Sequence, residues 1–541
     1  IGESAFGNCV SLTDITIPDE VTDIGKDAFY NCSVKTATIP ASAIESIPKT
    51  ILNTVVITSG NSIDEYAFNF CINLTSVTIP ESVNTIGENA FNHCNKLKTV
   101  SYKGEITGWC DISGLSNLTK NVSDLTLLIN GRELTELTVP NTVTFIPAYA
   151  FYNCTGLTSV TLSDSVTEVG EYAFNGCPIE NAIIPAIACR AVNNPALKTV
   201  TITGGNEIGE NAFLNCTRLS SITIPESVTN IGKKAFNGCT SLTEITLPYS
   251  VTNIAESAFY YCENLKTVSY RGDIKGWLEI NGLNNLMTAI SGVSLYINGR
   301  ELTRLTIPDS VTAIPNYAFS NCVNLTDVTI PDSVTSIGTG AFNKCRNLTS
   351  VNVPDSVTSI NNYTFRNCVS LTSIILPDGV TRIGIGAFDG CRNLTSVNVP
   401  DSVTTLYDET FRNCISLTSI TIPESVTSIY NSFDGCSNLK TFSYSGDLTG
   451  WFAMNGLQYL TESFSDVTLF INGTEVNELT IPDGITIIPA YAFRNCGSLT
   501  SLNLPNTIEQ FRQDAFKGCN NLKTVSYNGD LKSWCRIYEL N

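Results

Sequence analysis

Few residues in this chain could carry chemistry, and their spacing does not bring them together. His93 is the only histidine among 541 residues. A nucleophilic triad or a histidine-rich metal site needs a histidine beside its partners, whereas His93 occupies a turn position that Asn or Gly fills in most equivalent segments. The sequence also lacks a phosphate-binding loop, a dinucleotide fingerprint and a zinc-protease helix motif. We therefore predict no catalytic residue, no cofactor, no metal site and no enzymatic activity.

Carboxylates recur at one position, directly after a proline. Two interpretations fit this pattern. The carboxylate can accept hydrogen bonds from nearby turn amides, or a row of carboxylates can form a calcium-binding edge. Neighbouring carboxylates about 5 Å apart repel by about 0.8 kcal/mol per pair in water, so we favour the turn interpretation and keep calcium as the alternative. The longest run is Asp309, Asp332, Asp355, Asp378, Asp401 and Glu424.

Cysteine is abundant, with 20 residues. All but Cys110, Cys189 and Cys535 follow a recurring Phe by three residues. Equivalent side chains of stacked segments point the same way, which is poor geometry for a disulfide, and one Cys per segment is not zinc spacing. We predict buried thiols that act as small apolar side chains; a disulfide framework and a thiolate metal site are the alternatives.

The four tryptophans are the candidates for ligand contact, because aromatic side chains stack on sugars and anchor protein partners. Each lies 15 residues after a recurring Cys. The competing interpretation is that each Trp packs its own segment onto the body of the protein, since apolar residues such as Ile106 and Ile112 flank it. The four candidates are Trp109, Trp277, Trp451 and Trp534.

The elements that must position these residues are copies of one 23-residue unit, LTDVTIPDSVTSIGTGAFNKCRN at 325–347. Val328 and Ile330 alternate with polar residues, which predicts a strand with one buried face, and Pro331 ends its pairing. The residue before the unit's Cys is Asn or Gly in 13 of 17 copies. Since both types tolerate a left-handed backbone, we predict a sharp corner there.

Stacked copies of such a unit can bury an apolar face that one copy cannot, so the period predicts a solenoid. We expect a single continuous solenoid over 1–541, cut at both ends, with irregular coils at 39–60 and 184–205. Each Trp lies in an inserted module, at 100–140, 268–308 and 442–482, with a partial copy at 525–541. Asn-Gly pairs at 130–131, 298–299 and 472–473 predict a hairpin in each complete module.

The pattern LxxLxIPxxVxxIxxxAFxxCxx resembles the BspA-like, or treponemal-type, leucine-rich repeat, and the match covers nearly the whole chain. The resemblance implies a mainly β solenoid of short strands, turns and short helical pieces, shaped as a curved elongated rod. Because BspA-like proteins are generally bacterial cell-surface adhesins, it also implies an extracellular or cell-surface location.

Composition narrows the function further. A formal net charge of −19 argues against nucleic acid and against anionic membrane surfaces as partners, and no apolar run is long enough to span a bilayer. We predict a non-enzymatic cell-surface or secreted repeat protein that mediates adhesion or binds protein or glycan. Its partner would be a host or neighbouring-cell surface protein, a matrix protein or a glycan. The alternatives are a structural spacer and a targeting module of a larger enzyme.

Overall fold

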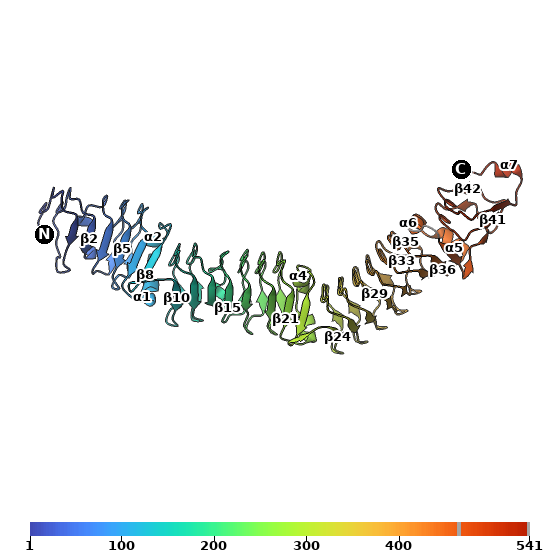
Figure 1. Cartoon of the computed structure of the whole chain (residues 1–541), viewed down its shortest axis with the longest axis horizontal. Coiled ribbons are helices and arrows are strands. Elements are labelled where there is room, and N and C mark those ends of the chain that lie inside the picture. The colour runs from blue at the N-terminus through green and yellow to red at the C-terminus, as the bar shows by residue number, and fades with distance from the viewer. Residues whose placement is uncertain (463–466, 538–541) are drawn as a thin grey trace. The chain divides into compact units, whose positions relative to one another are not determined.

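The structure is a computed structural model that describes residues 1–462 and 467–537 (Figure 1). It divides into two compact units, Ile1–Leu265 and Lys266–Asn541. Each unit is a mainly β solenoid with few short helices, which confirms the predicted fold class. That the two form one continuous solenoid stays a prediction. Parts of two predicted modules, 463–466 and 538–541, lie outside the described residues.

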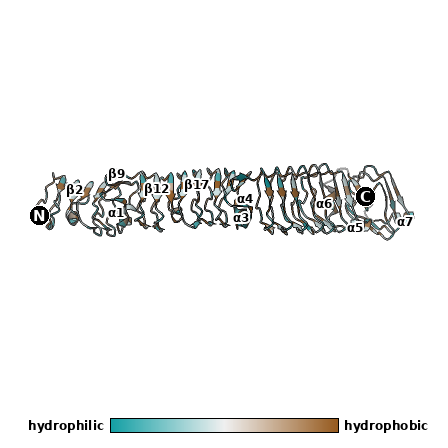
Figure 2. Ribbon diagram, turned by 90° about the horizontal axis from the view of Figure 1, so that it is seen from below, coloured by the Kyte–Doolittle hydropathy of each residue, from teal (hydrophilic) through white to brown (hydrophobic). Residues whose placement is uncertain are grey.

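One turn of the solenoid has three parts, as the unit at 325–347 illustrates. The first strand, β26 (Asp327–Thr329), buries Val328 and exposes Thr329. After Pro331 the chain returns through a second, two-residue strand, β27 (Ser336–Ile337). It then turns at the segment from Phe342 to Cys345, which we call the Phe–Cys corner. Hydrophobic and hydrophilic residues share the same strands (Figure 2), as a sheet with one buried face requires.

In the first unit, all the first strands except β19 form two parallel sheets in the order β1-β2-β3-β5-β7-β8 and β10-β12-β14-β15-β17. The first strands are β1 (Asp14–Thr16), β2 (Thr36–Ile39), β3 (Thr54–Ile57), β5 (Ser76–Ile79), β7 (Thr99–Tyr102), β8 (Thr126–Ile129), β10 (Glu136–Val139), β12 (Ser159–Leu162), β14 (Asn181–Ile184), β15 (Thr199–Ile202), β17 (Ser221–Thr223) and β19 (Glu244–Leu247). The second strands are β4 (Ser62–Ile63), β6 (Thr85–Ile86), β11 (Phe145–Ile146), β13 (Glu168–Val169), β16 (Glu207–Ile208), β18 (Asn230–Ile231) and β20 (Asn253–Ile254).

In the second unit, the short strands form a six-stranded parallel sheet, β25-β27-β29-β31-β33-β35. The first strands are β21 (Thr267–Tyr270), β22 (Ser294–Ile297), β24 (Arg304–Thr306), β26, β28 (Ser350–Asn352), β30 (Ser373–Ile374), β32 (Ser396–Val397), β34 (Ser419–Ile422), β36 (Thr441–Tyr444), β37 (Thr468–Ile471), β39 (Glu478–Thr480), β41 (Ser501–Leu504) and β43 (Thr524–Tyr527). The second strands are β25 (Ala313–Ile314), β27, β29 (Ser359–Ile360), β31 (Arg382–Ile383), β33 (Thr405–Leu406), β35 (Ser428–Ile429), β40 (Ile487–Ile488) and β42 (Gln510–Phe511).

The Phe–Cys corner is held by hydrogen bonds that run from one turn to the next. The amide of Phe319 donates to the carbonyl of Ala341 at 2.9 Å, and the amide of Asn321 donates to the carbonyl of Asn343 at 2.7 Å. The residue before the Cys has a positive φ, between 55° and 81°, in all 17 copies. The predicted left-handed corner is therefore confirmed at every repeat, including the four copies without Asn or Gly.

Each Trp module replaces part of a turn with helices and an antiparallel hairpin. In each complete module, the Asn and the Gly of the predicted turn both have positive φ, 48–50° and 71–78°, as a two-residue hairpin requires. This confirms the hairpins. Their outer strands are β9 (Arg132–Glu133), β23 (Arg300–Glu301) and β38 (Thr474–Glu475). The helices are α1 (Ile106–Asp111), α2 (Ser116–Thr119), α3 (Ile274–Glu279), α4 (Leu283–Met287), α5 (Leu448–Ala453), α6 (Leu457–Glu462) and α7 (Leu531–Trp534).

Two further turns lack a Phe–Cys corner and carry a short 3₁₀ helix instead, η1 (Ala41–Ser46) and η2 (Ala186–Ala188). Both follow a proline, Pro40 or Pro185, with extended backbone. Buried side chains, Ala43 and Ile44 in η1 and Ala186 and Ala188 in η2, keep these shorter turns in the stack.

Candidate binding surface

The module tryptophans lie inside the stack. Trp109, Trp277 and Trp451 are at most 1% exposed. The indole Nε1 of Trp277 donates to the carbonyl of Ala318 at 3.0 Å, and Trp109 and Trp451 make the same bond to the Ala of the following repeat. In an ordinary turn the carbonyl of this Ala accepts a hydrogen bond from the amide of the Phe one turn earlier, as the carbonyl of Ala341 does from the amide of Phe319. The indole therefore takes the place of a missing backbone donor.

Glycines make room for the aromatic pair in each module. The ring of Tyr270 tilts against that of Trp277 with centroids 5.7 Å apart. A Cβ on Gly272 would lie 2.5 Å from the Tyr270 ring, and one on Gly276 would lie 2.6 Å from the Tyr270 hydroxyl oxygen, which explains the Tyr-x-Gly-x-x-x-Gly-Trp spacing of the three complete modules. These contacts support the packing interpretation. In the fourth module Trp534 is half-buried, and ligand contact by the four tryptophans stays an untested prediction.

The cysteines form a buried ladder. All 20 thiols are free, and Cys110 and Cys189 occupy apolar positions as predicted. In most turns the Sγ donates to the carbonyl of the Phe in the preceding turn, as Cys391 does to Phe365 at 3.1 Å. Burial raises the pKa of the Cys262 and Cys436 thiols to about 12, so they stay protonated and weakly nucleophilic at neutral pH.

Thiol titration of the native protein is expected to detect only the accessible cysteines. Cys9 and Cys535 are exposed and should react rapidly with a disulfide reagent, Cys519 is half-buried and should react slowly, and the other 17 should react only after unfolding. Denaturant without reductant should release all 20 thiols. Fewer than 20 would indicate disulfides, and reaction of the buried set in the native state would contradict the ladder.

The six post-proline carboxylates, from Asp309 to Glu424, lie in consecutive turns of the second unit and are all exposed. In the part of the chain that the structure describes, none of the six accepts a hydrogen bond or forms an ion pair. The interpretation that they bond nearby amides is therefore not supported. The described residues also contain no group of three or more His, Cys, Asp or Glu that could hold a metal ion, so the calcium alternative gains no support either.

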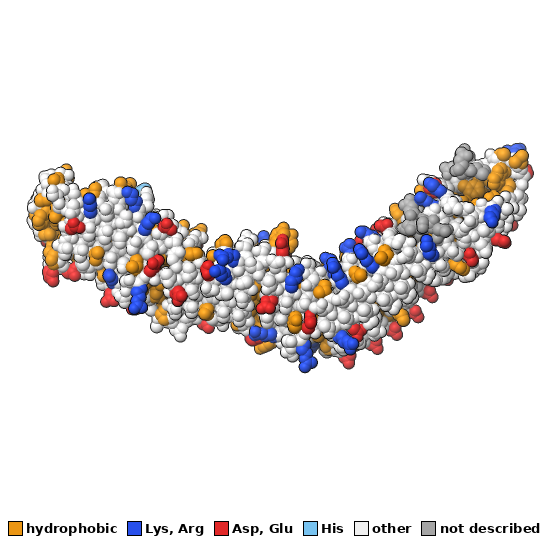
Figure 3. All heavy atoms as spheres, in the orientation of Figure 1, with side chains coloured by type: hydrophobic (Ala, Val, Ile, Leu, Met, Phe, Trp, Pro, Cys, Tyr) orange, Lys and Arg blue, Asp and Glu red, His pale blue; other side chains and the backbone are white. Residues whose placement is uncertain are grey.

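Basic residues lie within or directly after the Phe–Cys corners of the same unit. Asp389 is buried beneath them, with its side chain 5% exposed, and its carboxylate lies 2.9 Å from Nε of Arg366 and 3.9 Å from Nε of Arg412. In Figure 3, blue side chains follow one edge of this unit, and most of its red side chains lie along the other edge, where a few blue side chains also lie. The basic residues of this edge are Lys344, Arg346, Arg366, Arg392 and Arg412.

Between the basic and acidic edges, the first strands present an open groove of about 720 Å³. Ile375 lies in its wall and is 80% exposed, at an outward position where the neighbouring turns carry Asn352 and Asn398. The side chain of Asn398 donates to the carbonyl and accepts from the amide of Leu376, both at 2.7 Å. Because this amide group replaces a direct strand-to-strand bond, the ladder opens beside Ile375.

A second groove of about 600 Å³ lies on the first strands of the first unit. Ile183, 46% exposed, again occupies an outward position, and Asp164 accepts a short hydrogen bond from the hydroxyl of Thr203. Ser163 stands where most turns have proline. Both grooves thus combine one exposed Ile with hydroxyl, amide and carboxylate groups, a surface that can bind a partner.

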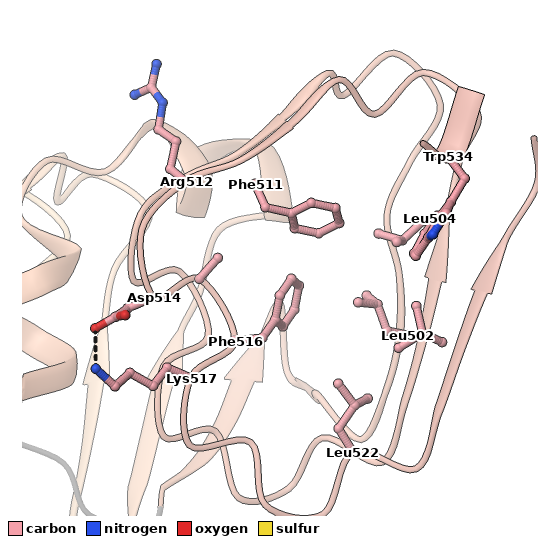
Figure 4. A pocket seen from close by; sticks show the side chains of 11 residues that line it. Leu502, Leu504, Phe511, Arg512, Asp514, Phe516, Lys517, Leu522 and Trp534 are labelled. Atoms are coloured by element: carbon pink, nitrogen blue, oxygen red, sulfur yellow. Dashed lines mark hydrogen bonds and ion pairs between the residues drawn. The ribbon is translucent and has the colours of Figure 1, made fainter. Parts of the chain in front are cut away.

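An apolar pocket of about 510 Å³ lies at the last described turns. Phe511 and Phe516 point into it from one side, and Leu502, Leu504 and Trp534 line the other (Figure 4). Equivalent residues form the interior of the other turns, where the next turn packs on them. The repeat alone accounts for this apolar lining.

Sequence reasoning missed a set of exposed aromatic side chains at the Phe–Cys corners of the first unit. Phe70 and Tyr261 are 56% and 55% exposed and occupy the left-handed position before the Cys, with φ of 60° and 61°. A bulky residue in this region costs about 1–2 kcal/mol, which Asn or Gly avoids. The signal was available in the sequence, since Phe70, His93, Tyr261 and Lys344 are the four departures from Asn or Gly.

Comparisons with known proteins place these features in context. No curated protein matches the chain. Within the described residues, no helix is long and apolar enough to cross a membrane. Among solved structures, a leucine-rich cell surface protein from Faecalibacterium prausnitzii is 28% identical, covering 79% of this chain and 92% of that one, with a TM-score of 0.33. A leucine-rich repeat protein from Bacteroides ovatus is 24% identical, with 80% and 92% covered and a TM-score of 0.35. The pneumococcal vaccine antigen PcpA is 17% identical, with 77% and 94% covered and a TM-score of 0.36.

The family profile described as "BspA type Leucine rich repeat region (6 copies)" matches residues 1–55, 49–111, 128–201, 185–277, 289–384, 358–461 and 466–536. Its longest gaps are 112–127, which follows α1, and 278–288, which begins within α3. The profile therefore covers the repeats and misses the inserted part of two modules. The matches span well over half of the chain and agree with the turn geometry described above. This chain belongs to the BspA-type leucine-rich repeat family.

Proposed function

We propose that the chain is a non-enzymatic cell-surface or secreted protein that adheres to a protein partner through the strand face of its second unit. The observation that carries this proposal is Ile375. Its side chain is 80% exposed within a face of Ser, Thr and Asn, and it lies beside the opening that Asn398 makes in the strand ladder. An exposed Ile gains nothing from folding there, whereas a partner can bury it.

The charge around the groove supports a protein as the partner. In each turn the basic edge precedes the first strand and the acidic edge follows it, so a bound surface meets cations on one side and carboxylates on the other. Complementary rims of this kind accelerate association and fix orientation, while a central apolar contact supplies most of the affinity. The fold is that of a repeat protein, and its extended face suits many weak contacts in parallel.

The experiment is a binding screen of the purified chain against immobilised matrix and cell-surface proteins, repeated with Ile375→Thr. We expect the variant to bind about tenfold or more weakly, because Thr removes the apolar contact. Its stability should change by less than about 0.5 kcal/mol, since Ile375 is a surface residue. Raising the salt concentration should weaken binding further as the rim charges are screened.

The matched control is Ile415→Thr, which removes an Ile that is 39% exposed in the same unit but outside the groove. It should bind like the native chain. Equal losses in both variants, or no binding of any probe through this face, would overturn the proposal and favour a spacer.

A further inference from the structure

The Phe–Cys corners of the first unit carry exposed aromatic clusters that packing does not explain. In each turn the Phe–Cys corner precedes the first strand, whereas the post-proline turn follows it. The corners are therefore separate from the strand face proposed above. We define the aromatic edge as Tyr66, Phe70, Tyr149, Tyr172, Tyr260 and Tyr261. Hydrophobic patches interrupt one edge of this unit in Figure 3.

The first cluster lies in two neighbouring turns. Phe70 stacks on His93 with centroids 4.3 Å apart and an interplanar angle of 19°. Tyr66, two residues before the Phe of the same corner, is 47% exposed. All three residues have φ of 59–60°. Each therefore adopts a backbone conformation that favours Asn or Gly while leaving an aromatic ring in water.

Two further aromatic clusters lie at later corners of the first unit. The ring of Tyr149 lies 5.2 Å from those of Tyr152 and Tyr172, and Tyr149 and Tyr172 have φ of 60° and 57°. Tyr260 and Tyr261 form a pair with centroids 4.0 Å apart, both about half exposed. At Phe70 and Tyr261, where most corners have Asn or Gly, exposure and a left-handed backbone both oppose folding, and strained residues of this kind gather at functional sites.

We infer that the aromatic edge binds a neutral glycan chain, with sugar rings stacked on the exposed aromatic faces. The contact area of two or three aromatic rings is far smaller than the about 800 Å² that each partner buries in a stable protein interface, but it is about the size of one or two sugar rings. Turns about 4.8 Å apart place successive clusters on the order of 10–20 Å from each other. A repeating polymer can span such spacings and bind at several points together.

The carboxylates beside the clusters favour a neutral ligand over an anionic one. Glu65, Glu171 and Glu263 are exposed next to the aromatic residues. Their carboxylates can accept hydrogen bonds from sugar hydroxyls, and they repel sulfated or sialylated chains. The net charge of −19 acts in the same direction.

The test measures binding of the whole chain to N-acetylglucosamine hexamer and to cellohexaose, with a sulfated heparin oligosaccharide as the charged comparison. The variants are Phe70→Asn, Tyr261→Asn and their combination. We expect each substitution to weaken binding of a neutral hexamer about three- to tenfold. The double variant should weaken it by the product of the two factors, because the binding free energies of separate contacts add. The melting temperature should stay the same or rise, because Asn relaxes the left-handed corner.

The matched control is Tyr249→Asn, which removes a tyrosine that is 63% exposed but lies after a proline rather than at the corner. Its binding should be unchanged. The inference is overturned if neither neutral hexamer binds, if the heparin oligosaccharide binds better, or if the corner variants bind normally. It is also overturned if they lower the melting temperature, which would mark the rings as structural. Ile375→Thr should leave glycan binding intact, so this inference and the proposed function fail separately.

Discussion

Phe365→Ala is expected to lower the free energy of unfolding of the second unit by about 3–5 kcal/mol. Phe365 is fully buried, and its ring lies 5.7 Å from those of Phe342 and Phe388, nearly parallel to both. Removing it creates a cavity and ends both stacking contacts. Urea unfolding followed by circular dichroism measures the loss.

The effect of Phe365→Ala should also spread along the stack. In a solenoid each turn packs only on its neighbours, so a cavity at one turn weakens the coupling between the turns on either side. We expect a broader transition as well as a lower midpoint. Phe365→Leu is the matched control and should cost less than about 1.5 kcal/mol, because it keeps most of the apolar volume. A loss below about 1 kcal/mol for Phe365→Ala would mean that the stacked Phe rings do not form the core.

The sequence was a good guide wherever residue type alone sets the local geometry. Asn and Gly before the Cys predicted a left-handed corner, and Asn298-Gly299 predicted a tight hairpin; both have the expected positive φ. The alternation of Val328 and Thr329 likewise predicted which face of the strand is buried.

The second left-handed position of the corner could not be predicted in this way. It lies two residues before the Phe and has φ of 52–64° in 16 of the 17 corners, although the residue is Tyr in six of them and varies in the others. At Tyr317 the amide donates to the carbonyl of Thr339 in the next turn at 2.9 Å. That bond exists only after the turns have stacked, so it imposes the conformation whatever the residue type.

The candidate sites show the same division. Residue type alone predicts ligand contact for Trp277, but its burial depends on the carbonyl of Ala318, which is 41 residues away in sequence. Ile375 lies at an outward strand position, which the alternation of its own repeat already exposes. The opening of the ladder beside it depends on the side chain of Asn398 in the next turn. The burial of Trp277 and this opening are properties of neighbouring turns, and no single repeat contains them.

The second large effect is expected for Trp277→Ala, which should lower the free energy of unfolding by about 3–5 kcal/mol. The indole is fully buried against Tyr270, and its loss leaves the Ala318 carbonyl without its donor, which pushes the cost toward the upper end. Trp277→Phe should cost about 1–3 kcal/mol, because a ring remains and only the hydrogen bond is lost.

Trp534→Ala provides the comparison that separates packing from ligand contact. Trp534 is half-buried and its Nε1 makes no hydrogen bond among the described residues, so its replacement should cost much less than that of Trp277. Binding should be measured well below the melting temperature of each variant. If Trp277 acts only by packing, Trp277→Ala will bind normally while it is folded. A Trp277→Ala protein that unfolds like the native chain but no longer binds would instead establish the indole as a ligand contact. It would also require the module to open, because the closed structure leaves no face of the ring accessible.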